Sequence, residues 1–218
     1  SLPVLQTGAQ PFHLELTGER DYFLTHTHLP VQFTSFIECL DALRKSRETL
    51  MGEGYLAASI DSMQWNDTMA RASVFVGPVF TWGVLRNGNI PAMVLQQTGT
   101  DTKHYFQHPL KAGDVQRLFE KIIRYYENHG YPFASLQLDS ARFEQHHLYA
   151  RLQLDRGKRC TIDTIILNEE SHTARSFLLP YLGLKQGMLY DESLMKLIRR
   201  KIAALNFLQE SAPWKVEF

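Results

Sequence analysis

The sequence predicts an α+β fold in which one unit of order β-α-α-β-β is repeated in tandem. The phrase Gly-Tyr-x-x-Ala-Ser occurs twice, starting at Gly54 and at Gly130, and each copy follows a helical pattern and precedes a strand-like one. The copies are 76 residues apart at these glycines, and 80 residues apart at Gly77 and Gly157. A phrase repeated at a nearly fixed period indicates a repeated structural unit, whereas an active-site motif normally occurs once.

Composition limits the possible functions. With 218 residues, 44% of them hydrophobic, the chain is long enough for one large domain or for two to three small ones with real cores. Lys plus Arg and Asp plus Glu both total 23, so the basic excess expected of a nucleic-acid binder is missing. Cys39 and Cys160 lie in different segments, without disulfide-framework or zinc-finger spacing. No stretch approaches the roughly 18 apolar residues of a membrane helix.

The first unit opens with a strand at residues 12–17, where Phe, Leu and Leu alternate with polar residues. Ser35 and Glu38 have the spacing of a capping box, which predicts a helix that runs on to the first Gly-Tyr phrase. Two strands follow, at 55–65 and 70–77, and we expect them to form a hairpin.

The second unit contains the clearest helix of the chain. Apolar residues recur at helical spacing between an expected N-cap at Asp114 and a stop at Gly130. The other elements expected in this unit are an opening strand at 79–87, a short helix at 91–97, a second strand at 133–138, a connection at 142–147 and a closing strand at 148–154.

The third unit is expected to be incomplete. It has an opening strand at 159–170, a short helix at 174–182 and a long helix from Asp191, but only "WKVEF" follows that helix. We therefore expect its closing strand to be missing, and we divide the chain into domains at 1–77, 78–156 and 157–218.

The ordered and repeated motifs resemble those of POTRA domains, the polypeptide-transport-associated repeats of the BamA/TamA superfamily. The resemblance rests on Gly-Tyr-x-x-Ala after the first two long helices, on Leu154-Asp155-x-Gly157 followed by Cys160-x-Ile162, and on the run from Tyr181 to Tyr190. The residues expected to define the repeat are Gly54, Tyr55, Gly77, Gly130, Tyr131, Gly157, Gly183 and Gly187.

The resemblance implies that each unit packs two helices on a small three-stranded mixed sheet. It also implies a periplasmic scaffold, without enzymatic activity or cofactor, in an outer-membrane assembly factor. Its partners would be unfolded outer-membrane proteins, periplasmic or inner-membrane accessory proteins, and a C-terminal β-barrel of the same protein. We slightly favour a TamA-like over a BamA-like factor.

In the family, the second strand of a repeat is the exposed one and pairs with an extended peptide. The candidate edge residues are Phe133, Ala134, Ser135, Leu136, Gln137 and Leu138, and in the first unit Leu56, Ala57, Ala58, Ser59 and Ile60. The alternative is that neighbouring segments cover both edges.

Two other functions remain open from the residues. One is the periplasmic part of a two-partner secretion transporter, and the other is a periplasmic hydrolase or metal-dependent enzyme. The enzyme has little support, because the sequence has no Gly-x-Ser-x-Gly elbow and its histidine pairs lie in different predicted loops. A zinc site needs three or four converging ligands. We therefore predict no catalytic, metal-binding or cofactor-binding residue.

Overall fold

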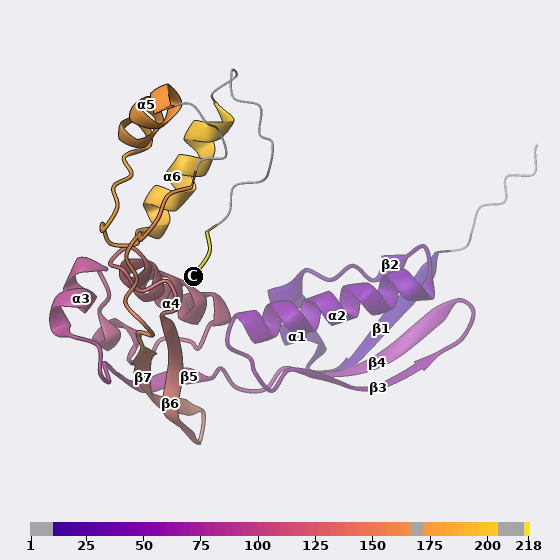
Figure 1. The fold of residues 1–218 in the computed structure, drawn as a ribbon. Helices are drawn as coiled ribbons and strands as arrows, with labels where there is room; N and C mark the ends of the chain where they lie inside the picture. The colour runs from indigo at the N-terminus through magenta and orange to yellow at the C-terminus, as the bar shows by residue number, and fades with distance from the viewer. Residues whose placement is uncertain (1–10, 167–171, 205–215) are drawn as a thin grey trace, which may run out of the picture. The chain divides into compact units, whose positions relative to one another are not determined.

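The computed structural model describes residues 11–166, 172–204 and 216–218 (Figure 1). Its elements are β1 (Phe12–Gly18), α1 (Arg20–Thr27), β2 (Gln32–Phe33), α2 (Phe36–Gly52), β3 (Ser59–Trp65), β4 (Met69–Phe75), β5 (Thr81–Arg86), α3 (Ala92–Gln97), a 3₁₀ turn η1 (Thr102–Tyr105), α4 (Ala112–Glu127), β6 (Ser135–Glu144), β7 (His147–Asp155), α5 (His172–Leu182) and α6 (Glu192–Ala203). The chain forms two compact units, one comprising 1–85, 102–116 and 140–150, the other 86–101, 117–139 and 151–218.

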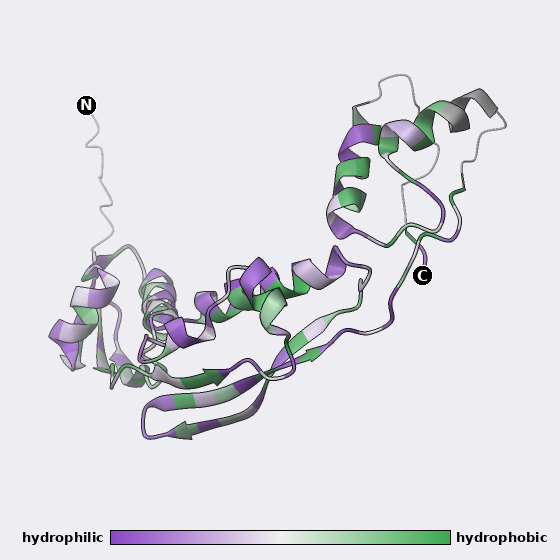
Figure 2. Cartoon of the chain, turned by 90° about the vertical axis from the view of Figure 1, so that its left-hand side faces the viewer, coloured by the Kyte–Doolittle hydropathy of each residue, from purple (hydrophilic) through white to green (hydrophobic). Residues whose placement is uncertain are grey.

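The first sheet is mixed and has the strand order β2-β1-β4-β3. β1 pairs in parallel with β4, while β3 pairs with β4 and β2 with β1 in antiparallel fashion. Alternate residues of β1 and β4 are buried, and they form one core with the apolar face of α2. Figure 2 shows the resulting alternation of hydrophobic and hydrophilic residues along strands and helices.

α2 begins where the capping box predicts. The Ser35 hydroxyl accepts a hydrogen bond from the Glu38 N–H at 3.2 Å, and the Glu38 carboxylate accepts one from the Thr34 N–H at 2.8 Å. The first bond satisfies an N–H group that the first helical turn leaves without a partner, and the second joins the residue before the N-cap to the helix. The bonds from Thr34 also lower the pKa of Glu38.

The β-α-α-β-β order implies a helix at the place of α1, but the residues did not indicate its position, and β2 was not predicted. In α1 only Phe23 is buried, so its apolar residues do not repeat at helical spacing. β2 is two residues long and adds a fourth strand to a sheet expected to have three.

The second sheet has the order β5-β7-β6. Leu118, Ile122 and Tyr126 are buried on one face of α4, as the periodicity predicts. The expected N-cap at Asp114 is wrong, because α4 starts at Ala112 and Asp114 lies in its first turn. The expected connection at 142–147 is also too long: β6 runs to Glu144 and β7 starts at His147.

The last part of the chain contains α5 and α6, whose buried residues form a separate core with Leu184 and Tyr190. Asp191 caps α6 by accepting the Leu194 N–H at 2.9 Å. The predicted opening strand at 159–170 is wrong for its described part, where Thr161 alone forms a bridge, with Leu189. Ile162 forms backbone bonds with Gly187 and Met188 rather than joining a ladder of strands. Residues 167–170 and the first two residues of "WKVEF" lie outside the described residues, and its described residues 216–218 form no strand.

The repeated Gly-Tyr-x-x-Ala-Ser phrase forms the same turn in both copies. Gly54 and Gly130 have φ of 105° and 90°, a region that favours glycine. The N–H of the following tyrosine donates to a carbonyl of the last helical turn at 3.0 Å in both copies, and the alanine N–H then donates to the tyrosine carbonyl. The serine begins the strand. The phrase therefore ends a helix and starts a strand.

A backbone network beyond each turn is also repeated. Gly54 accepts the Phe80 N–H at 2.8 Å, and Gly130 accepts the Cys160 N–H at 2.7 Å. The Phe80 carbonyl in turn accepts the Leu110 N–H at 2.8 Å, and the Cys160 carbonyl accepts the Tyr190 N–H at 3.1 Å. Leu110 and Tyr190 each precede the next long helix. The repeat of the sequence is thus also a repeat of hydrogen bonds.

Candidate peptide-binding edges

Both predicted edge segments lead into strands that end a sheet. β3 and β6 are terminal in their sheets among the residues that the structure describes. The predicted strand starts are wrong, however: Leu56, Ala57 and Ala58, like Phe133 and Ala134, lie in the turns before the strands. Ser59 and Ile60 lie in β3, and Ser135, Leu136, Gln137 and Leu138 lie in β6.

β3 has a bulge that keeps its apolar residues on the helix side of the sheet. The register shifts between Ile60 and Ser62, so Asp61 is the extra residue. Ile60 and Met63 are half-buried and pack against the first core. Asp61 is exposed, and its carboxylate accepts the Ser59 hydroxyl at 2.6 Å.

The ladder with β4 determines which β3 backbone groups point outward. The Asn66 N–H donates to the Met69 carbonyl at 2.9 Å, which closes the β3–β4 hairpin. Pairs in an antiparallel ladder alternate between hydrogen-bonded and non-hydrogen-bonded. Because Asn66 and Met69 form a hydrogen-bonded pair, the pairs Trp65–Ala70 and Met63–Ala72 are non-hydrogen-bonded. Their N–H and C=O groups therefore point to the open edge.

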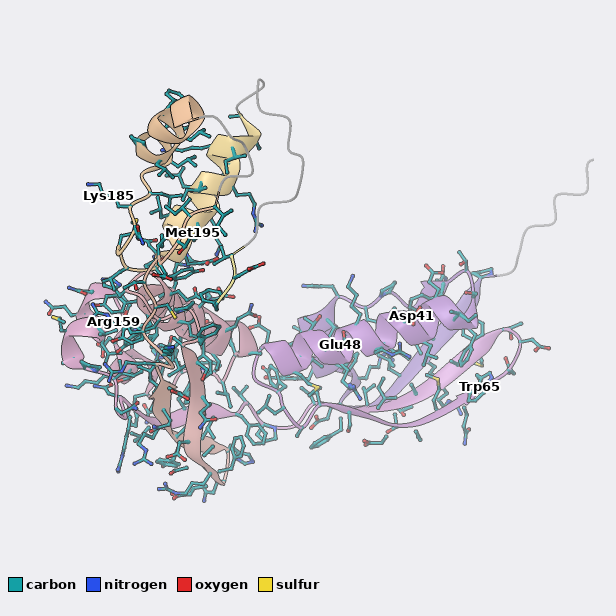
Figure 3. The ribbon with its side chains drawn as sticks, in the orientation of Figure 1. Asp41, Glu48, Trp65, Arg159, Lys185 and Met195 are labelled. Carbon is teal, nitrogen blue, oxygen red and sulfur yellow. The ribbon has the colours of Figure 1, made fainter. Side chains whose placement is uncertain are left out.

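An aromatic pair lies at one end of β3. The rings of Phe36, at the start of α2, and Trp65, at the end of β3, stack with centroids 4.9 Å apart and planes at 19°. Trp65 is 61% exposed, and Figure 3 shows it far along the β3 strand. The pair gives an apolar side chain a flat surface to contact. The sequence analysis did not include either residue in the site.

Arg47 lies on the same side of α2 as Phe36. Eleven residues are close to three helical turns, so the two side chains leave the helix in nearly the same direction. Arg47 is half-buried, and its Nε is buried without a hydrogen-bond partner. No pattern in the sequence distinguishes this arginine from Arg44, which is exposed and pairs with Asp41.

The charged side chains on β6, in contrast, are paired. The Asp139 carboxylate accepts hydrogen bonds from the Arg151 guanidinium, and Arg142 donates to Glu144 at 2.8 Å. Arg142 also lies 5.0 Å from the centre of the Tyr149 ring. Ser140, in the middle of β6, has a φ of 53°.

The histidines lie in separate places. His104 and His108 stack at 4.7 Å, the His147 ring bonds to the Thr81 hydroxyl, and His26 bonds to the Tyr55 hydroxyl. In the described part of the chain, no three His, Cys, Asp or Glu residues come together as metal ligands would. The bond to the Tyr22 hydroxyl, with burial, raises the pKa of Tyr55 to about 12, so this phenol stays protonated near neutral pH.

The arrangement of elements is similar to that of solved POTRA structures. POTRA3-5 of BamA from Haemophilus influenzae superposes with a TM-score of 0.56 at 15% identity, over 95% of this chain and 91% of that one. POTRA1-3 of Omp85 from Anabaena gives 0.43 at 12% identity, over 89% and 83%. The N-terminal domain of Omp85 from Thermosynechococcus elongatus gives 0.43 at 9%, over 90% and 85%. No protein-family model and no curated protein matches the sequence.

None of the described helices is both long and apolar enough to cross a membrane. The conclusion on the fold rests on the BamA structure, which this chain matches over nearly its whole length. The protein has the fold of tandem POTRA domains.

Proposed function

We propose that this chain is the periplasmic scaffold region of an outer-membrane protein assembly factor and that it binds extended segments by strand addition. The clients would be unfolded outer-membrane proteins, handed on to a C-terminal β-barrel of the same protein. Periplasmic or inner-membrane accessory proteins would be further partners. The protein would act as a scaffold rather than as an enzyme, at the periplasmic side of the outer membrane.

The observation that carries this proposal is the position of β3 and β6 at the ends of their sheets. A strand at the end of a sheet presents unpaired N–H and C=O groups, which an extended peptide can pair with whatever its sequence. The POTRA fold supports the same function, because the superposed structure is part of BamA.

The proposal includes the domain limits expected from the sequence, at 1–77, 78–156 and 157–218. The two copies of the turn support a repeated unit, and the limits themselves stay a prediction from the sequence. The TamA-like branch stays a prediction.

The test is a pair of substitutions at Met63, whose N–H points to the open edge of β3. Met63→Pro removes that donor, and proline is tolerated on edge strands when its position donates no ladder bond. Met63→Ala removes the same contact with the core but keeps the N–H, so it is the matched control. The probe is a fluorescent synthetic peptide taken from one membrane strand of an outer-membrane β-barrel protein.

We expect the peptide to bind the Met63→Ala variant and to bind the Met63→Pro variant about tenfold more weakly, the effect of roughly one lost hydrogen bond. Equal binding by the two variants, or no binding by the unaltered protein at millimolar peptide, would refute strand addition at β3. Circular dichroism of both variants checks that they are folded.

A further inference from the structure

We propose that the groove between β3 and α2 selects extended segments that carry a carboxylate side chain opposite Arg47 and an apolar side chain on Phe36 and Trp65. This inference rests on the proposed strand addition at β3 and specifies which segments that edge prefers.

The groove is defined by residues from two elements. Ile60, Met63 and Trp65 lie on the helix side of β3. Phe36 of α2 stacks on Trp65, and Arg47 leaves the helix in nearly the same direction as Phe36. Side chains of an added strand alternate between the two faces of the sheet. Those on the helix side would therefore enter the space beside α2.

Arg47 is the unusual residue in this groove. A guanidinium group is charged at all physiological pH values and carries five N–H donors. Its Nε is buried without a partner, and no ion pair joins Arg47 to any residue in the described stretches. Burying an unpaired donor on a charged group costs free energy. A ligand carboxylate would supply the missing partner, and a bidentate one fits the arginine fork.

The nearest acidic residues of the chain are engaged or directed elsewhere. Glu38 accepts from Thr34, Asp41 pairs with Arg44, and Asp61 accepts from Ser59. Glu48 follows Arg47 directly, so its side chain leaves α2 about 100° further around. Figure 3 shows Asp41 and Glu48 on α2. The groove thus presents positive charge without an acidic partner of its own.

Helix and strand dimensions give the spacing of the two side chains in the ligand. Eleven helical residues from Phe36 to Arg47 span about 16 Å, at roughly 1.5 Å per residue. A strand covers this distance in about five residues. Because side chains on one face are an even number apart, the acidic and apolar residues should be separated by about four or six positions.

The test compares the affinities of two peptides. Both are capped ten-residue peptides of alternating polar and apolar residues that contain one phenylalanine. Four positions from this phenylalanine, one peptide has a glutamate and the other a glutamine. A second pair of peptides differs from the first only in a spacing of six positions. Arg47→Gln removes the proposed partner. Lys45→Gln is the control, since Lys45 is exposed and lies on nearly the opposite side of α2.

At one of the two spacings, we expect the peptide with glutamate to bind about tenfold more tightly than the matching peptide with glutamine, as for a charge-assisted hydrogen bond. That ratio should fall to about one in Arg47→Gln and stay unchanged in Lys45→Gln. A ratio of one in the unaltered protein, or a ratio that survives Arg47→Gln, overturns the inference.

The Met63 pair separates this failure from a failure of the proposed function. If the peptides bind without charge preference and Met63→Pro still weakens binding relative to Met63→Ala, strand addition stands and only the selectivity is refuted. If the Met63 variants also bind alike, strand addition at β3 is refuted, and the selectivity with it.

Discussion

β3 and β6 begin with the same turn and end their sheets in the same way, yet their side chains offer a ligand different surroundings. β6 carries paired charges, Asp139 with Arg151 and Arg142 with Glu144. On the β3 side, Arg47 leaves α2 in nearly the same direction as Phe36, which stacks on Trp65, and its buried Nε has no partner among the described residues. Repeating a backbone unit would therefore repeat the proposed site for strand addition without repeating the proposed selectivity.

The difference indicates two kinds of edge in one chain. Backbone pairing at either edge tolerates many sequences, because every residue except proline offers the same N–H and C=O groups. An arginine with an unpartnered Nε would add a preference at β3, whereas internally paired charges at β6 would leave little to attract a charged ligand. A scaffold of this kind would accept many clients and still favour one register on its first sheet.

The largest difference in stability between the two copies of the turn is expected when Gly54 or Gly130 is replaced by alanine. At Gly54 an added Cβ would lie 3.3 Å from the Phe80 carbonyl oxygen and 3.4 Å from the Leu110 nitrogen, both backbone atoms. At Gly130 its nearest neighbour, at 3.1 Å, is the end of the Leu189 side chain, which can move, and the nearest backbone atom is the Cys160 oxygen at 3.4 Å. Both residues also have positive φ, which alone costs roughly 1 kcal/mol for alanine.

We therefore expect Gly54→Ala to lower the free energy of unfolding by about 2 kcal/mol and Gly130→Ala by about 1 kcal/mol. Urea titrations of the two variants measure both values. Equal losses would show that the two turns are equivalent, and no loss at either position would contradict the positive φ.

A smaller effect of opposite sign is expected at Arg47. Arg47→Met keeps an unbranched side chain that reaches about as far as Nε and removes the unpartnered buried donor, so the variant should be more stable by about 1 kcal/mol. Arg151→Met, which removes the ion pair with Asp139, should not be stabilised. Thermal unfolding of both variants without peptide is sufficient, and a destabilised Arg47→Met would mean that Arg47 supports the fold rather than a ligand.

The smallest expected effect on stability comes from the carboxylates that bind the backbone at Gly77 and Gly157, where the first two repeated units end. The Glu19 carboxylate accepts the Val76 and Gly77 N–H groups at 2.7 and 3.0 Å, and these bonds lower its pKa. At the corresponding Gly157, the acceptor is Asp155, only two residues away. A carboxyl group with a lowered folded-state pKa gives stability that is present above its unfolded-state pKa and lost as the pH falls through the folded-state value.

Glu19→Gln should therefore lower the Tm slightly near neutral pH, and this difference should shrink as the pH falls from about 6 to about 3. Asp155→Asn should have a smaller effect near neutral pH, because its bond connects neighbouring residues. A Tm difference between Glu19→Gln and the unaltered protein that grows as the pH falls would contradict the lowered pKa of Glu19.

Much of the fold could be predicted from the sequence because its repeats carry strong local signals. The Ser35 and Asp191 caps and the periodicity of α4 determine helices whose apolar faces are continuous. The Gly-Tyr phrases also predicted the correct helix ends. Their turns take up more residues than expected, so β3 and β6 start later than the apolar pattern indicates.

The features that depend on distant residues could not be predicted. α1 buries only Phe23, and the segment after Thr161 depends on backbone bonds to Gly187 and Met188 instead of a neighbouring strand. The groove is a stronger example. Nothing near Trp65 in the sequence shows that it stacks on Phe36, and Arg47 differs from neighbouring basic residues only in what surrounds it.

The most direct test of strand addition is amide hydrogen exchange of the peptide-bound protein, measured residue by residue by NMR. The N–H groups of Met63 and Trp65, which point to the open edge, should gain protection when peptide is added. Those of Ser62 and Gln64, already in hydrogen-bonded pairs of the ladder with β4, should change much less. A bound peptide that leaves Met63 and Trp65 exchanging at their free rates would contradict the account.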